Sequence, residues 1–200
     1  MRVFSSLELN KSGDPPSFDD VLIVPRFTAI RSRSVPSTES YLGGGITLSI
    51  PLISSPMDTV TDSGMAISLG VRGGMGIVHR FMSPKEQVFE LSKVVEFNHN
   101  PLYPVSENQT AYVVPAVGVG ESERDRFNVL FDEIGDNLDA VAIDVANGNS
   151  SYMIDMIDWV KNKTGGDIPI IAGNVATGCG FVRLSEAGAD AVRVGIGGGS

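Results

Sequence analysis

Residues 140–178 read AVAIDVANGNSSYMIDMIDWVKNKTGGDIPIIAGNVATG and contain one complete strand–helix–strand pattern. The apolar runs at 140–144 and 168–173 have the length of buried strands in a parallel sheet. Between them, Ser150 precedes apolar residues at helical spacing, and Gly165 supplies a glycine at the expected helix end. Two such strands joined by an amphipathic helix predict an α/β fold built around a parallel sheet.

The same alternation extends in both directions from this unit. The apolar runs that we expect to form six strands are 46–55, 74–79, 111–119, 140–144, 168–173 and 191–195. Helices are expected at about 62–72, at 83–97, after Ser122 or Asp125, after Ser150 and after Thr177. The helix at 83–97 has the clearest start, because Ser83 and Glu86 form a capping box with Pro84 at the first helical position. Its apolar face is expected to carry Val88, Leu91 and Val95.

Six strands fall short of a closed barrel. A TIM (β/α)8 barrel needs about 250 residues, whereas the sequence has 200. An open six-stranded piece would leave two unpaired sheet edges and an unplugged apolar interior. We therefore expect residues 47–200 to be about the first six strands of a TIM barrel, either within a longer protein or as one half of a split barrel. Residues 1–46, interrupted by Pro25 and Pro36, are expected to form an irregular N-terminal arm that packs on the barrel.

The charge balance excludes some classes of partner. A formal net charge of −9 and a pI near 4.6 argue against a nucleic-acid or anionic-membrane surface, since either requires clustered Lys and Arg. The sequence shows neither a run of about 20 apolar residues nor the apolar core of a signal peptide, which predicts a cytoplasmic protein. The single cysteine, Cys179, cannot form an internal disulfide, and we expect it to be an ordinary buried thiol near a helix start.

Polar, glycine-rich segments follow every expected strand. They read SSPMDTVTD (54–62), HRF (79–81), GVGES (118–122), DVANGNS (144–150), GNVATG (173–178) and GIGGGS (195–200). In a parallel β/α barrel the loops after the strands build the active site, so we expect these segments to gather at one rim. Gly195, Gly197 and Gly199 permit positive φ angles and a close approach of the backbone to a ligand.

Several of these segments resemble the IMP dehydrogenase/GMP reductase family. The matching stretches are Ser54–Thr61, Ala172–Thr177 and Ala187–Ser200, together with Phe18–Leu22 and Ser32–Ser34 near the N-terminus. The first three are similar, in order, to the family's nucleotide-cradling loop, to its loop after the fifth strand and to the run into its catalytic loop. The resemblance covers nearly the whole chain and implies a purine-nucleotide oxidoreductase on a TIM barrel.

The resemblance also implies roles for individual residues. The residues that would contact an NADP(H) or NAD cofactor are Asp144, Val145, Ala146, Asn174, Gly195, Ile196, Gly197, Arg80, Ser32 and Arg33. Those that would contact the purine mononucleotide, GMP or IMP, are Ser55, Met57 and Ser200. Backbone carbonyls of Gly197 and Gly199 would bind a monovalent cation, K⁺. With its neighbour His79, Arg80 matches the family position where a basic residue approaches the cofactor. The family further implies a homotetramer, in which the arm near Ser32 reaches a neighbour's cofactor.

Some of these positions have a structural alternative. Asp144 could instead cap the next turn, and Met57 taken alone would be a core side chain. GGGS is also the composition of a flexible linker. The preceding residues 193–196 stand in family register, which favours the functional interpretation.

The family's nucleophile is a cysteine two residues beyond the position of Ser200. The sequence therefore contains no catalytic residue of this kind, and we expect the 200-residue chain alone to be inactive. In the family, the thiolate attacks C2 of the purine nucleotide to form a covalent adduct. GMP reductase then releases ammonia and takes a hydride from NADPH, whereas IMP dehydrogenase passes a hydride to NAD and hydrolyses the adduct.

Two features favour GMP reductase. There is room for only a loop between the capped helix and the third expected strand, so the CBS module that most IMP dehydrogenases insert there is not expected. The segments 144–148 and 78–81 also look closer to reductases, whereas 58–61 and 73–76 look closer to dehydrogenases. An IMP dehydrogenase without the module is thus the alternative. A third possibility is a non-catalytic half-barrel that pairs with a separately encoded second half.

Overall fold

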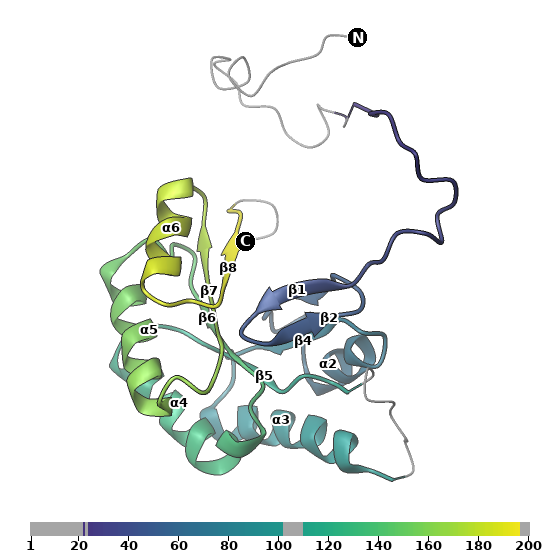
Figure 1. Ribbon diagram of the computed structural model, residues 1–200. Coiled ribbons are helices and arrows are strands. Elements are labelled where there is room, and N and C mark those ends of the chain that lie inside the picture. Colours follow the sequence, from purple (N-terminus) through teal and green to yellow (C-terminus); the bar gives the residue numbers. More distant parts are fainter. Residues whose placement is uncertain (1–21, 23, 102–109, 197–200) are drawn as a thin grey trace. The chain divides into compact units, whose positions relative to one another are not determined.

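The computed structural model describes residue 22, residues 24–101 and residues 110–196 (Figure 1). Contacts within the chain divide it into two units, residues 1–37 and residues 38–200. The described residues of the first unit form no helix or strand. Residues 38–46 belong by their contacts to the second unit, and the packing of an arm on the barrel stays a prediction.

An antiparallel hairpin precedes the main sheet. β1 (Ser40–Gly43) pairs with β2 (Ile46–Leu48) across a turn of glycines with positive φ. The prediction of one strand over 46–55 was therefore wrong, because β2 pairs backwards with β1 and only β3 (Ile53–Ser54) enters the parallel sheet. Pro51 separates β2 from β3, since proline has no N–H for a ladder hydrogen bond.

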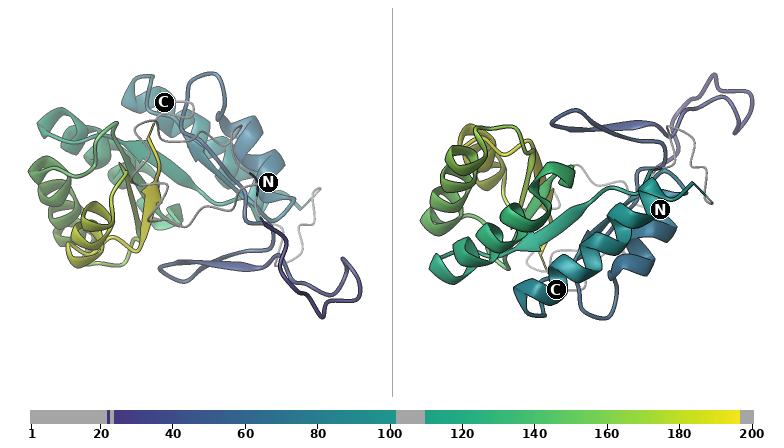
Figure 2. Two further views of the ribbon diagram at one scale, coloured as in Figure 1. Left: turned by 90° about the horizontal axis from the view of Figure 1, so that it is seen from above. Right: turned by 90° about the horizontal axis from the view of Figure 1, so that it is seen from below.

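Six parallel strands follow, each paired with the next along the chain. They are β3, β4 (Met75–Val78), β5 (Val114–Val117), β6 (Val141–Asp144), β7 (Ile170–Val175) and β8 (Ala191–Val194). The connections contain α2 (Ser63–Gly70), α3 (Pro84–His99), α4 (Glu121–Ile134), the short 3₁₀ turn η1 (Gly135–Asn137), α5 (Ser151–Thr164) and α6 (Gly178–Glu186). The helices lie along one face of the sheet (Figures 1 and 2). This order confirms the prediction of a partial TIM barrel.

Most helix ends are those that the sequence predicts. The N-cap side chains that accept a hydrogen bond from the first turn are Asp62, Ser83, Ser150 and Thr177, of which the last three are predicted from the sequence. Gly165 ends α5 in the left-handed conformation, with φ of 69°. The start of α4 differs, because this helix follows Gly120, whose φ of 94° favours glycine, and both Ser122 and Asp125 lie inside the helix.

Alternate strand residues face two apolar layers. The layer toward the helices includes Val78, Val117, Val141, Ile143 and Ala172, packed with Leu91, Phe127, Leu130 and Ile157. The opposite layer contains Met75, Ile77, Val114, Ala116, Ala140, Ala142 and Ile171, together with Ile46 and Leu48 of the hairpin. The hairpin therefore fills the interior of the half-barrel, which the six parallel strands alone would leave open. None of the described helices is long and apolar enough to cross a membrane.

Two aspartate side chains form hydrogen bonds with backbone groups at the amino ends of the strands. The Val113 N–H donates to Oδ2 of Asp139 (2.7 Å), and the Asp139 N–H donates to the Val113 carbonyl (3.1 Å). Asp190 and Ile170 repeat this pair of hydrogen bonds at the start of β7 and β8, both at 2.9 Å. Each aspartate thus satisfies an amide group that the ladder leaves open.

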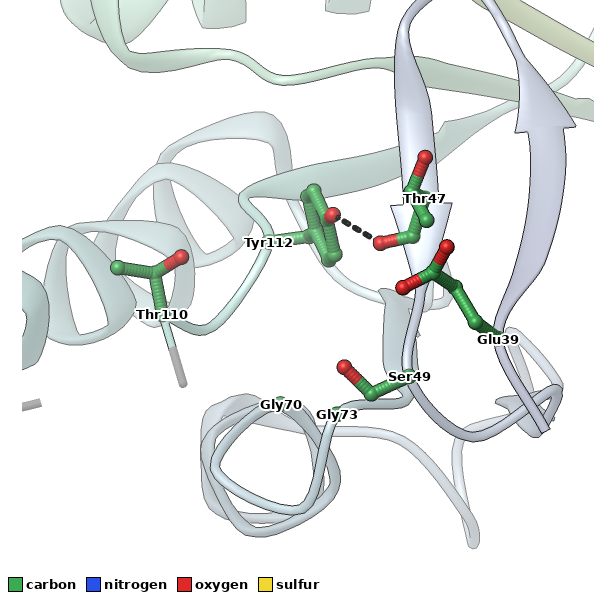
Figure 3. Close-up of a pocket in the computed structure, with 7 residues that line it drawn as sticks. All are labelled: Glu39, Thr47, Ser49, Gly70, Gly73, Thr110 and Tyr112. Carbon is green, nitrogen blue, oxygen red and sulfur yellow. Dashed lines mark hydrogen bonds between the residues drawn. The ribbon is translucent and has the colours of Figure 1, made fainter. Parts of the chain in front are cut away.

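A polar pocket of about 130 Å³ lies beside the hairpin at this end of the sheet (Figure 3). Its lining residues are Glu39, Thr47, Ser49, Gly70, Gly73, Thr110 and Tyr112. The Tyr112 hydroxyl donates to the Thr47 carbonyl (2.8 Å), which joins β2 to the residues before β5. Burial and the nearby Asp139 carboxylate raise the pKa of the Tyr112 hydroxyl, so it stays a neutral donor.

Candidate functional site

Three residues in register on neighbouring strands form the centre of the site at the carboxyl ends. Asp144 on β6 lies opposite Gly173 on β7, and Gly173 lies opposite Arg193 on β8. The Arg193 guanidinium reaches across Gly173 and donates to the Asp144 carboxylate. A β-carbon on Gly173 would lie 2.7 Å from the β-carbon of Arg193, so glycine leaves the room for this bridge. The Asp144 and Arg193 side chains stay 22% and 25% exposed, which leaves the pair within reach of a ligand.

Asn174 follows directly as an extra residue in β7. The pairing of β7 with β8 shifts between Gly173 and Val175, as at a β-bulge, a feature that often re-aims a side chain near a site. The Asn174 Nδ2 donates to the Gly195 carbonyl (2.8 Å), and its N–H donates to the Val145 carbonyl (2.9 Å). Its Oδ1 is buried and, among the described residues, has no hydrogen-bond partner. An unpaired buried acceptor is costly, so this oxygen suits a donor on a ligand.

The loop after β3 faces the last strand of the sheet. Ser55 and Arg193 line one cavity of about 170 Å³, which otherwise has mainly apolar walls from β1, β3, β4, β7 and β8. The loop is folded on itself, because the Ser55 carbonyl accepts from the Thr61 hydroxyl (2.6 Å) and from the Met57 N–H (2.8 Å). The Met57 side chain is 40% exposed, so it is not a core residue.

Arg80 follows β4 and has a different set of neighbours. Its Nη1 lies 3.6 Å from Oε1 of Glu123 on α4. The adjacent His79 is buried, and its Nδ1 accepts from the Phe81 N–H (3.2 Å), which turns the imidazole into the protein. Sequence reasoning missed Glu123, because an acidic residue in the first turn of a helix is ordinary.

Gln87 is a second residue that sequence reasoning missed. The buried residues of α3 are Gln87, Leu91 and Val94, whereas Val88 and Val95 of the predicted face are only partly buried. A glutamine four residues before a buried leucine, on the same side of a helix, was the available signal. A buried polar side chain needs partners, and the partners of Gln87 lie at the rim between β4 and β5.

The other predicted site residues fall into three groups. Val145, Ala146, Gly195 and Ile196 follow β6 and β8 directly and so lie beside Asp144 and Arg193. Gly197, Gly199 and Ser200 lie outside the described residues, so the K⁺ site and the phosphate contact stay predictions. Ser32 and Arg33 belong to the first unit, where both are exposed and the Ser32 and Ser34 hydroxyls hydrogen-bond at 2.8 Å.

Cys179 is exposed, so the prediction of a buried thiol was wrong. The inward face of α6 carries Gly180 and Leu184 instead, and Cys179 precedes them on the outer side of the first turn. Within residues 22, 24–101 and 110–196, no three His, Cys, Asp or Glu side chains group into a metal site.

The arrangement favours the binding of a polar ligand. One carboxylate, one guanidinium and one amide with a free oxygen meet at the ends of β6, β7 and β8. These groups together accept and donate hydrogen bonds in fixed directions, and a cavity adjoins them. These groups lie at the carboxyl ends of parallel strands, which is where the loops of β/α barrels form active sites.

Known proteins match this chain over almost all of its length. A family model described as "IMP dehydrogenase / GMP reductase domain" matches residues 16–200. An inosine-5'-monophosphate dehydrogenase from Cryptosporidium parvum is 35% identical over 215 residues, which cover 92% of this chain and 52% of that protein. The corresponding enzyme from Rhodopirellula baltica is 28% identical over 293 residues, covering 92% and 54%.

A protein named for the other activity is about equally similar. The GMP reductase of Lactobacillus johnsonii is 34% identical over 182 residues, which cover 90% of this chain and 50% of that protein. The chain thus spans about half the length of the curated relatives that it matches. Because the family model covers residues 16–200 and the site lies on the matching loops, the chain belongs to the IMP dehydrogenase/GMP reductase domain family.

Proposed function

We propose that the protein carrying this chain is a purine-nucleotide oxidoreductase that uses a nicotinamide dinucleotide, and that within the family it is a GMP reductase. The observation that carries the proposal is the cluster of Asp144, Arg193 and Asn174 at the carboxyl ends of β6, β7 and β8. Asn174 and Arg193 belong to segments that resemble the family, and Asp144 matches the position of an aspartate that contacts the dinucleotide in the family.

The residues at this end fit a nicotinamide dinucleotide. The Asp144 carboxylate can accept hydrogen bonds from ribose hydroxyls, and the bridge from Arg193 holds that carboxylate in one orientation. The unpaired Oδ1 of Asn174 can accept a hydrogen bond from an N–H of the nicotinamide carboxamide. Gly173 and Gly195 let the backbone approach closely. The bound dinucleotide supplies the hydride chemistry, and the chain's residues bind and orient it.

The purine mononucleotide is proposed to bind beside this cluster. Ser55 and Arg193 line the cavity of about 170 Å³ between β3 and β8, and Met57 is exposed in the same loop. A cavity of this size accommodates part of a mononucleotide, since whole ligand pockets have roughly 300–1,000 Å³. Ser200 is proposed to contact the phosphate, and Gly197 and Gly199 to bind K⁺. A homotetramer remains part of the proposal.

The lengths of the alignments support the choice of GMP reductase. The reductase alignment is 182 residues long and covers 90% of this chain, which is 180 of its 200 residues. Few insertions therefore separate the reductase from this chain. The two dehydrogenase alignments are 215 and 293 residues long, although each covers 92% of this chain, or 184 residues. The dehydrogenases therefore carry extra residues inside the aligned region. In this chain α3 ends at His99 and β5 begins at Val114, which leaves no room for an inserted domain.

IMP dehydrogenase is the second candidate. The dehydrogenase from Cryptosporidium parvum is as similar as the reductase, at 35% against 34% identity. The segments 58–61 and 73–76 also look closer to dehydrogenases.

Steady-state assays of the complete gene product would separate these candidates. With GMP and NADPH, a reductase forms IMP, NADP⁺ and ammonium, whereas with IMP, NAD⁺ and water a dehydrogenase forms xanthosine monophosphate and NADH. We expect NADPH oxidation that depends on GMP. Turnover of IMP alone would assign the dehydrogenase, and nucleotide binding without either turnover would support the non-catalytic half-barrel.

Asp144→Asn tests the cluster itself. Loss of the charged acceptor should lower kcat/KM by about 10- to 100-fold, because a hydrogen bond to a charged group contributes about 1.5–3 kcal/mol. The matched control is Asp139→Asn, which changes an aspartate at the other end of the sheet and should leave kcat/KM unchanged. Equal losses in both variants would contradict the assignment.

A further inference from the structure

A polar network below Arg80 joins two strand ends to two helices. At its base, the Gln87 side chain is fully buried, and its Nε2 donates to the carbonyl of Ala116 (2.8 Å) and, at 3.4 Å, to that of Val78. The Gln87 Oε1 accepts from Nη1 of Arg126 (3.0 Å). Because Val78 ends β4 and Ala116 lies on β5, Gln87 anchors Arg126 to both strands.

Glu123 stands between this anchored arginine and Arg80. Its Oε2 accepts from the Gly118 N–H (2.7 Å) and lies 3.3 Å from Nε of Arg126. The Arg126 Nη2 also donates to the Met82 carbonyl (2.9 Å), so this guanidinium is held on several sides. The other carboxylate oxygen of Glu123, Oε1, faces Nη1 of Arg80 at 3.6 Å. The Glu123 carboxylate is therefore fixed on one side and presents its other oxygen to Arg80.

The two arginines differ in how fully they are bound. The Arg126 side chain is 12% exposed and has Gln87, Met82 and Glu123 as partners. The Arg80 side chain is 26% exposed and forms its ion pair with Glu123 at the longer distance of 3.6 Å. The Nε of each arginine is buried without a hydrogen-bond partner among the described residues. Two guanidinium groups share one carboxylate, so the cluster keeps a positive charge. Such a charge, with N–H donors left over, matches a phosphate oxygen.

Gly118 allows Arg80 and Glu123 to pack over the backbone between them. A β-carbon at this position would lie 3.0 Å from Cγ of Glu123 and 3.2 Å from Cζ of Arg80. The guanidinium also lies 5.4 Å from the centre of the Phe81 ring, which limits its motion on another side. The direction of Arg80 is thus set by Glu123 and by close packing.

We infer that Glu123 is a positioning residue, which directs the Arg80 guanidinium toward a phosphate of the dinucleotide and acts only through Arg80. The inference rests on the proposed function, in which Arg80 contacts the cofactor. It adds a residue that touches neither substrate nor cofactor.

A double-mutant cycle on the complete gene product tests this inference. The dissociation constant of NADPH would be measured by its fluorescence for wild type, Arg80→Met, Glu123→Gln and the double variant. Glutamine keeps the shape and an oxygen for the Gly118 N–H but removes the charge. We expect Glu123→Gln to weaken NADPH binding by about 3- to 10-fold in the wild-type background and to have no effect beside Arg80→Met. A loss of equal size in both backgrounds would overturn the inference.

Whether Glu123→Gln weakens or tightens NADPH binding separates positioning from simple charge repulsion. If Glu123 acted merely as a negative charge near an anion, its removal would tighten NADPH binding, and that result would also overturn the inference. Affinity for GMP separates positioning from a general loosening of the fold. We expect Glu123→Gln to leave GMP binding unchanged, whereas equal weakening of GMP and NADPH would indicate a structural role only.

Glu121→Gln is the matched control on the same helix. Glu121 forms an ion pair with Arg124 at 2.8 Å, and its side chain is 85% exposed, so we expect NADPH affinity within twofold of wild type. Failure of the proposed function is distinguishable, because it would appear as absent NADPH binding in the wild type or as an unchanged affinity in Arg80→Met.

Discussion

The two ends of the parallel sheet use the same kinds of residue for different purposes. At the amino ends, Asp139 and Asp190 each accept from the N–H of a residue at the start of a neighbouring strand. At the carboxyl ends, Asp144 accepts from the half-buried Arg193 side chain, and Asn174 keeps a buried oxygen unpaired. Polar groups thus hold the backbone at one end and are available to a ligand at the other. Residue type alone therefore does not reveal which aspartate is available to a ligand.

The free energy of unfolding should depend most on the apolar contacts between the hairpin and the sheet. Leu48 is 2% exposed and belongs to the inner apolar layer. Leu48→Ala should lower the free energy of unfolding by about 2–5 kcal/mol, because it leaves a cavity between the hairpin and the sheet. Denaturant unfolding followed by the fluorescence of the single tryptophan, Trp159, measures the change.

Leu52→Ala is the control for this substitution. Leu52 lies between β2 and β3 and is 58% exposed, so its truncation should change the free energy of unfolding by no more than about 0.5 kcal/mol. If the two substitutions had equal effects, the hairpin would not fill the interior as described above.

A substitution at the carboxyl end should damage binding more specifically. Gly173→Ala places a β-carbon 2.7 Å from both Cβ and the carbonyl oxygen of Arg193. We expect a loss of about 1–3 kcal/mol in stability from overpacking. The displaced Arg193 should also release Asp144, which would weaken NADPH binding by at least roughly tenfold. Equilibrium titration and thermal unfolding separate the two effects.

Gly178→Ala provides the comparison for Gly173→Ala. No heavy atom lies within 4 Å of a β-carbon built at Gly178, which begins α6. This substitution should leave NADPH binding unchanged and keep or slightly raise stability, by less than about 1 kcal/mol. Unchanged binding in Gly173→Ala as well would show that the bridge across β7 does not matter for the ligand.

The smallest expected effect concerns the charge on Asp139. Burial of the carboxylate against the start of β5 raises the pKa of Asp139, although the hydrogen bond from the Val113 N–H opposes this shift. The folded state then binds the proton more tightly than the unfolded state, whose pKa is about 4. Stability should therefore fall as pH rises from about 4 through the raised pKa. The residue is partly solvent-exposed, so the change should be small.

Asp139→Asn should flatten this part of the pH profile. The asparagine oxygen can still accept from the Val113 N–H, so stability at neutral pH should change by no more than about 1 kcal/mol. Asp125→Asn, on the exposed side of α4, controls for the loss of one negative charge. A slope between pH 4 and 7 that is the same in wild type and Asp139→Asn would contradict the prediction.

Much of the second unit could be predicted because its signals are local. Short apolar runs marked β4 to β8, and the capping side chains of Ser83, Ser150 and Thr177 marked the starts of three helices. The hairpin could not be predicted in this way. Ile46 and Leu48 read as the beginning of a longer strand, and only pairing with β1 shows otherwise.

The candidate site was predicted only in part for a related reason. The resemblance to a family points to Asp144 and Asn174, and their positions at the carboxyl ends of β6 and β7 agree with a common rim. Their actual partners depend on register, since Arg193 reaches Asp144 only because Gly173 lies between them. Gln87 on α3 contacts Arg126 on α4, and Glu123 on α4 contacts Arg80 in the loop after β4. Spacing along the sequence does not encode contacts between such distant segments.

Each strand of the parallel sheet pairs with its neighbour along the chain, and this has a consequence for how the molecule folds. Each β/α unit finds its partner close by in sequence, so loop closure costs little entropy and assembly can proceed from the first unit onward as the polypeptide is synthesised. The hairpin is the exception, because Ile46 and Leu48 share their apolar cluster with Ile171 on β7. We expect that cluster to pack late, after β7 has been synthesised, and to stabilise the units that formed before it.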